Sequence, residues 1–204
     1  MSNVRLDTLF LIIAALVLPA SASAEYYEST SMEVMAFNNS PARSCYQDAT
    51  IAARIHYTSR KSLENCNYAL SRTAMSLRDR AATHANRGII FMSLEEFPKA
   101  IEDYNKALAM KPELGELYVN IGNVYYMGDA FEKAIAEYNK ALEMKTSKPH
   151  VAHFNRGMAY ENLKNYASAE ADYTAAQALM PDWTAPPAKL AELQQQKNQP
   201  TGAP

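Results

Sequence analysis

Cys45 and Cys66 are the only two thiols in the chain. A pair of thiols can carry out redox chemistry, hold a metal ion or form a structural disulfide. Redox-active pairs usually have two residues between the cysteines, whereas twenty residues separate these two. We therefore predict a structural Cys45–Cys66 disulfide, with a redox pair as the alternative.

Histidines are the next candidates, because an imidazole can bind a metal ion or move a proton. The chain has four of them: His56, His84, His150 and His153. His150 and His153 are three residues apart and could share one side of a helix, but no cysteine or acidic cluster stands at ligand spacing from them. We predict no metal site and no other cofactor.

Catalytic motifs are missing from the sequence. It contains no Gly-x-Ser-x-Gly and no glycine-rich phosphate loop, and it has only six glycines. Several carboxylates alternate with lysines in the pattern of a solvated helix surface: Glu102, Asp103, Glu132 and Glu137. We predict that the protein is not an enzyme.

The composition is that of one modest folded domain with short tails. The chain has 204 residues, 48% of them hydrophobic and 21% charged, and a net charge of -2. This balance excludes wholesale disorder and a multispanning membrane protein. A dedicated nucleic-acid-binding protein would carry a basic surplus, so we expect no nucleic-acid partner.

Residues 1–24 have the pattern of a secretory signal peptide. Arg5 precedes an apolar run from Leu9 to Leu18, and a stretch of alanines and serines ends at Ala24. Ten apolar residues are too few for a stable membrane span, so we expect cleavage before Glu25, with an uncleaved anchor or a mistaken start codon as alternatives. The prediction is an exported protein of the bacterial periplasm. Residues 25–40 are polar and aperiodic, which predicts a flexible leader.

A repeat extends over about half of the chain, from residue 81 to residue 182. Residues 99–111 and 133–145 are identical at ten of thirteen positions and lie 34 residues apart. Three glycines share this spacing: Gly88, Gly122 and Gly157. Aromatic residues and alanines follow each glycine at matching distances, among them Tyr104, Tyr138 and Tyr173. The last interval is 35 residues, so the turn near Thr146 should be altered.

This pattern resembles the tetratricopeptide repeat (TPR) family, and we identify the chain as an exported bacterial member on that basis. The resemblance implies an all-α fold, a right-handed superhelix of helix-turn-helix repeats. It predicts three repeats over residues 81–114, 115–149 and 150–183. Residues 62–70 align with 100–108, which predicts a degenerate repeat over 41–80. A capping helix over 184–197 and a disordered tail over 198–204 complete the prediction.

Arrays of this family commonly bind peptides on the concave surface formed by the first helix of each repeat, so the resemblance implies a non-catalytic, protein-binding scaffold. It also implies which residues line the groove: Ala85, Ile89, Met92, Val119, Asn123, Tyr126, Phe154, Met158 and Glu161. Of the cationic and amide residues with which some members grip a carboxylate, only Asn123 has a match here. We expect the ligand to carry aliphatic or aromatic side chains, and we expect Tyr126 and Phe154 to be the groove residues that contact them most closely.

Charge divides unevenly along the chain. Residues 41–87 hold eight basic and three acidic residues, whereas residues 95–145 hold six basic and ten acidic ones. The basic end could dock an acidic partner as an accessory subunit of an envelope enzyme, or merely solvate its helices. A self-assembling structural module is a further alternative to the peptide-binding scaffold.

Overall fold

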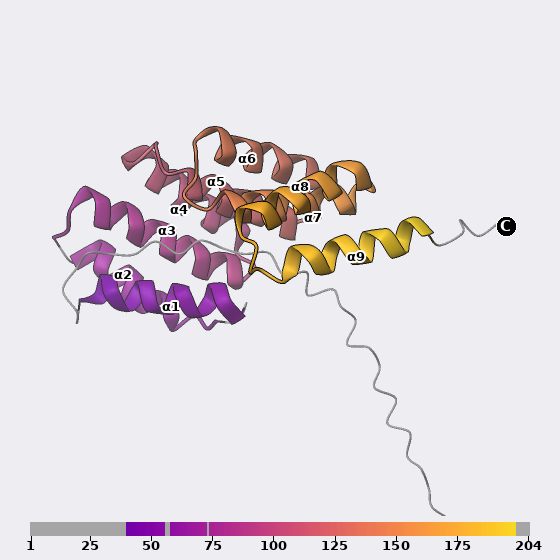
Figure 1. Cartoon of the computed structure of the whole chain (residues 1–204). Coiled ribbons are helices and arrows are strands. Elements are labelled where there is room, and N and C mark those ends of the chain that lie inside the picture. The colour runs from indigo at the N-terminus through magenta and orange to yellow at the C-terminus, as the bar shows by residue number, and fades with distance from the viewer. Residues whose placement is uncertain (1–39, 56–57, 73, 199–204) are drawn as a thin grey trace, which may run out of the picture.

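The computed structural model describes residues 40–55, 58–72 and 74–198, and these residues form helices joined by short turns (Figure 1). Within these ranges there are nine helices and no strand: α1 (Pro41–Ile55), α2 (Ser62–Arg72), α3 (Leu77–Ser93), α4 (Phe97–Met110), α5 (Gly115–Met127), α6 (Phe131–Glu143), α7 (Pro149–Asn162), α8 (Tyr166–Leu179) and α9 (Ala185–Asn198). The predicted all-α helical repeat is confirmed. The predicted signal peptide, and all but Ser40 of the predicted leader, lie outside the described residues.

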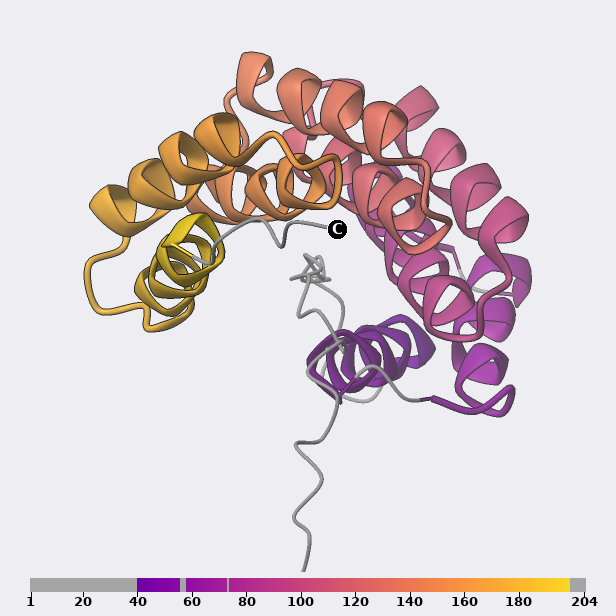
Figure 2. The same cartoon turned by 90° about the vertical axis from the view of Figure 1, so that its right-hand side faces the viewer.

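Successive helices pack in pairs, and the pairs stack into an arch. The closest packing is between α3 and α4, between α5 and α6, and between α7 and α8. Figure 2 shows α3, α5 and α7 along the inner side of this arch and α4, α6 and α8 along its outer side. The helices α1 and α9 lie at its two ends, so each closes one end of the stack.

A tyrosine packed on a glycine holds each pair together. Tyr104, Tyr138 and Tyr173 are fully buried on the second helices. A Cβ atom added to Gly88 would lie 2.5 Å from Tyr104 Cε1, and one added to Gly157 would lie 2.7 Å from Tyr173 Cε1. Gly122 and Tyr138 meet in the same way. Only glycine allows the ring to approach so closely, which explains why these residue types recur together.

The turn inside each pair has the same geometry. Glu95, Asp129 and Lys164 adopt positive φ angles of 59°, 54° and 58°. The next residue donates its backbone N–H to a carbonyl five residues earlier, as from Ala130 to Tyr125 (2.9 Å). A left-handed residue ends the first helix and reverses the chain. Lys145 (φ 54°) repeats this conformation between α6 and α7, so the connection after the second repeat is altered as predicted.

The first pair, α1 and α2, is joined by the predicted Cys45–Cys66 disulfide. Its S–S distance is 2.08 Å, and the two Cα atoms are 4.8 Å apart. Cys66 aligns with Tyr104, so a covalent bond stands where the later pairs have a tyrosine ring against a glycine. Both cysteines are fully buried, and the short side chains of Ala49 and Ala52 let α1 lie close to its neighbours. No helix among the described residues is long and apolar enough to cross a membrane.

We predict that Cys45→Ser lowers the free energy of unfolding by about 3 kcal/mol, because the bond closes a loop of 21 residues in the unfolded chain. Thermal unfolding followed by circular dichroism measures the change. The helical signal at low temperature should stay nearly intact, because most residues of the buried core lie in α3 to α9. Cys66→Ser should have the same effect, and loss of most helical signal in either variant would contradict this division of the chain.

Candidate partner-binding site

The structure places eight of the nine predicted groove residues in the packed interior. The buried residues are Ala85, Ile89, Met92, Val119, Asn123, Tyr126, Phe154 and Met158. Even the two expected anchors are covered, since Tyr126 is 6% exposed and Phe154 is 2% exposed. The prediction that these two side chains stand open to a ligand is wrong.

Aromatic neighbours explain the burial of the two expected anchors. Phe154 packs against Trp183, with ring centroids 4.6 Å apart, and against Tyr173 at 5.4 Å. Trp183 lies in the turn between α8 and α9, so this turn covers Phe154 on α7. Tyr126 packs edge-on against Phe131 at 5.5 Å, and its hydroxyl accepts a hydrogen bond from Asn162 Nδ2 (3.0 Å). Both residues therefore join elements within the array.

Asn123 has a structural role as well. Its Oδ1 accepts hydrogen bonds from the Tyr138 hydroxyl and from Asn155 Nδ2, both at 2.8 Å. The first bond joins α5 to α6, and the second joins α5 to α7. A fully buried amide oxygen with two donors is committed to the interior. Asn123 therefore has no acceptor left for a ligand at this oxygen.

Glu161 is the one predicted groove residue that keeps part of its side chain exposed, at 12%. Its Oε2 accepts a hydrogen bond from the Tyr173 hydroxyl (2.6 Å) and lies 3.7 Å from Lys189 Nζ on α9. The carboxylate thus stands at the edge of the inner side, between α7, α8 and the cap. It gives this edge a polar group that a ligand can reach.

Two buried ion clusters repeat along the array, and the first joins α2, α3 and α4. Arg87 donates from Nε to Asp103 Oδ2 (2.6 Å) and from Nη2 to Asp103 Oδ1 (2.8 Å). His84 Nδ1 lies 2.9 Å from the same Oδ1, and Arg87 Nη1 donates to Asn67 Oδ1 (2.7 Å). Burial alone would raise the pKa of Asp103, but the bonds from Arg87 and His84 outweigh it and hold that pKa below its ordinary value.

The second cluster, on α6, α7 and α8, has the same form. Arg156 donates to both oxygens of Asp172, at 2.7 and 2.6 Å, and His153 Nδ1 lies 2.8 Å from Oδ1. Arg156 Nη1 also donates to Asn139 Oδ1 (2.5 Å) on the preceding pair. We call this arrangement the arginine clamp. In each arginine clamp the histidine, His84 or His153, contacts the aspartate. The described residues include no cluster that could hold a metal ion.

The middle repeat lacks the arginine clamp. Tyr118 stands where the others have histidine, Ile121 where they have arginine, and Glu137 where they have aspartate. Burial raises the pKa of Glu137, and the positive charge of Lys140 offsets this only in part. Lys140 Nζ lies 4.4 Å from the centre of the Tyr118 ring. The junction between α4 and α5 therefore has no arginine that bridges two pairs.

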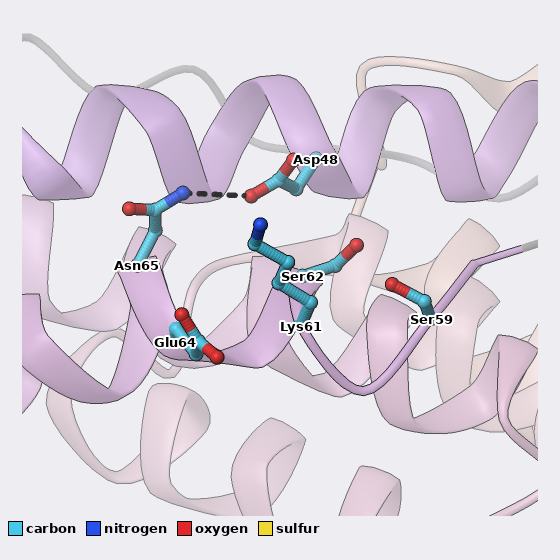
Figure 3. A pocket seen from close by; sticks show the side chains of 6 residues that line it. All are labelled: Asp48, Ser59, Lys61, Ser62, Glu64 and Asn65. Carbon is cyan, nitrogen blue, oxygen red and sulfur yellow. Dashed lines mark hydrogen bonds between the residues drawn. The ribbon is translucent and has the colours of Figure 1, made fainter.

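The basic end presents a polar pocket between α1 and α2 (Figure 3). It has a volume of about 280 Å³ and is lined by Asp48, Ser59, Lys61, Ser62, Glu64 and Asn65. Asn65 Nδ2 donates to Asp48 Oδ2 (3.0 Å). Nearby, Arg60 pairs with Glu96 (2.6 Å), whereas Arg54 and Lys61 have no ion-pair partner among the described residues.

Comparisons with known proteins agree with this architecture. Three family profiles described as tetratricopeptide repeat match residues 81–114, 115–148 and 150–183. The Arabidopsis OM64 TPR domain is 21% identical, with a TM-score of 0.55 over 59% of this chain and 99% of that one. No curated protein matches the chain.

Two further solved structures hold a peptide. The first TPR of Spaghetti (RPAP3), bound to the HSP90 peptide SRMEEVD, is 22% identical, with a TM-score of 0.54 over 59% of this chain and 94% of that one. The second TPR domain of human RPAP3, in complex with the HSP70 peptide SGPTIEEVD, is 21% identical, with a TM-score of 0.53 over 58% and 98% of the two chains. At these identities the likeness shows the fold alone.

Proposed function

Because this chain belongs to the tetratricopeptide repeat family, with three repeats between residues 81 and 183, we propose that it is a non-catalytic scaffold that binds a peptide or helix of a partner protein. The proposal rests mainly on one observation. Four side chains of types that can act in catalysis are instead part of the arginine clamps that hold the repeats together: His84, Asp103, His153 and Asp172. Peptide binding by structural neighbours such as the RPAP3 domains supports the same class of function.

The ligand segment on this proposal lies along the inner side of the arch, beside α7. Tyr126 and Phe154 lie beneath this surface, covered by their aromatic neighbours, and are not its anchors. Glu161 and Asn162, at the end of α7, keep exposed atoms at its edge. The Glu161 carboxylate at this edge is already paired with Lys189 (3.7 Å), so a neutral group of the ligand fits there better than a free acidic C-terminus.

We also propose that the scaffold works in the cell envelope, after export and cleavage before Glu25. The buried Cys45–Cys66 disulfide supports this compartment, because disulfides form and persist in oxidising surroundings. The basic end remains a second candidate surface, favoured by Arg54 and Lys61, which are exposed and have no ion-pair partner within the described part of the chain.

Site-specific photo-crosslinking in producing cells tests both surfaces. We expect a benzoylphenylalanine placed at Glu161 to give a discrete adduct with one partner protein in the envelope fraction. The same probe at Glu102, an exposed residue on the outer helix α4, is the matched control and should give none. The same probe at Lys61 reports on the basic end, and adducts from Lys61 but not from Glu161 would move the binding surface there. An absence of adducts from both Glu161 and Lys61 would contradict the scaffold proposal.

A further inference from the structure

The first helix has a side that faces away from the other described helices, apart from Asp48 at its edge, which accepts a hydrogen bond from Asn65 of α2. Ala42, Cys45, Ala49 and Ala52 of α1 are buried toward the rest of the array. On the opposite side, six residues follow each other at helical spacing, and we call them the α1 stripe: Ser44, Gln47, Asp48, Ile51, Arg54 and Ile55. Ile51 is 55% exposed and Ile55 is 60% exposed. Two neighbouring large apolar side chains thus face outward on one helix.

The corresponding side of α3 shows what such a surface does inside the array. There α1 and α2 cover the helix, and Ile90 is fully buried. Two hydrogen bonds hold this cover in place, from Arg80 Nη1 to the Leu70 carbonyl (3.0 Å) and from Ser93 Oγ to the Ala52 carbonyl (3.4 Å). No described helix precedes α1, so none of the described helices covers its outward side in this way. Polar residues solvate one half of the α1 stripe, as a terminal repeat requires, whereas the isoleucines occupy the other half.

The charges on the α1 stripe are complementary to themselves. Asp48 lies three residues before Ile51, and Arg54 lies three residues after it. When two copies of α1 pack antiparallel about a twofold axis at Ile51, residue 48 of each faces residue 54 of the other. Such a pairing joins the apolar side chains at its centre and makes an Asp48–Arg54 ion pair on both sides.

The polar pocket offers a place for the incoming guanidinium. Asp48 and Glu64 contribute two carboxylates to its lining, and Lys61 contributes one ammonium (Figure 3). The lining therefore has an excess of one negative charge, and the hydroxyls of Ser59 and Ser62 add acceptors. One arginine side chain would balance the charge and use several of these acceptors.

From these observations we infer that the α1 stripe is a twofold interface between two copies of this chain, with Arg54 of each copy in the polar pocket of the other. The interface goes beyond the scaffold function, since it gives the assembly two separate peptide-binding arrays. A single helix pair buries less than a permanent dimer needs, so the dimer is weak and its population depends on the protein concentration.

Light scattering on the oxidised mature protein over a concentration series tests the interface. We expect the mass to rise from that of one chain to that of two. Ile51→Asp should lower the association constant about a hundredfold or more, because it puts a carboxylate at the centre of an apolar contact. The matched control is Leu179→Asp, which changes an equally exposed apolar residue on α8 (51%) and should leave the dimer intact. A monomeric mass at every concentration, or dimerisation unaffected by Ile51→Asp, would overturn the inference.

A charge exchange tests the geometry independently. Arg54→Asp alone and Asp48→Arg alone should each lower the association constant about tenfold or more, because like charges then face each other. The double variant with both changes should restore dimerisation, because each new charge again meets its opposite. Ile51→Cys should also form a disulfide-linked dimer across the axis, seen on a non-reducing gel, and Leu179→Cys should not. Failure of both the rescue and the crosslink would exclude this arrangement even for a protein that dimerises.

Discussion

Replacing Tyr138 by alanine is expected to lower the free energy of unfolding by about 3 to 5 kcal/mol, because it empties a fully buried ring site. The ring fills the space above Gly122, and its hydroxyl donates to Asn123 (2.8 Å). The variant therefore loses packing within one pair and leaves a buried acceptor with one donor fewer. Urea unfolding followed by circular dichroism measures the change.

Two controls separate the ring from its surroundings. Tyr68→Ala removes the same side chain from an exposed site (58%) on α2 and should change stability by less than about 0.5 kcal/mol. Gly122→Ala should destabilise the protein that keeps Tyr138, because the new Cβ would lie 2.7 Å from Cδ1 of the ring. In the Tyr138→Ala background the same change should be neutral or stabilising, since alanine favours a helix. An equal effect in both backgrounds would contradict the contact.

Asp172→Asn should cost about 3 kcal/mol of stability, because it leaves Arg156 partly buried without its counter-ion. The amide that replaces the carboxylate also presents N–H groups to the donors of Arg156 and His153. The matched control is Glu137→Gln, the same chemical change at the corresponding position of the middle repeat. Burial raises the pKa of Glu137, so removing its charge should cost nothing or stabilise the fold.

The pH dependence checks the same contact. Burial raises the pKa of Asp172, but the bonds from Arg156 and His153 outweigh it, so the folded-state pKa lies below the ordinary value. The stability that Asp172 contributes is present above the unfolded pKa of about 4 and is lost as the pH falls through the folded value. Asp172→Asn should abolish this part of the acid dependence. A variant as acid-sensitive as the parent protein would contradict the assignment.

The fold could be predicted from sequence because its main contacts use residue types with few substitutes. A helix pair that brings backbone against a tyrosine ring needs glycine, and the recurrence of Gly88, Gly122 and Gly157 with their tyrosines fixes both the period and the pairing. The disulfide was predictable for a similar reason, since the chain has only two cysteines.

The binding surface could not be predicted with the same precision. An apolar residue on the inner side of a helix has the same pattern whether it faces a groove or a neighbouring element. Phe154 shows this, because its burial depends on Trp183, which comes 29 residues later and reaches it only through the turn before α9. The arginine clamp could have been predicted from the sequence. Arg87 and Arg156 occupy the same position of their repeats, and so do Asp103 and Asp172.

The missing clamp of the middle repeat has a mechanical consequence. Arg87 donates to Asn67, and Arg156 donates to Asn139, so an arginine bonds each of these helix pairs to the preceding one. Asn105, at the equivalent position of α4, is exposed, and Ile121 stands at the position of the arginine. We therefore expect the junction between α4 and α5 to bend more easily than the two junctions that an arginine clamp joins. Bending at this junction would change the curvature of the arch while the contacts within α1 to α4 and within α5 to α9 stay in place.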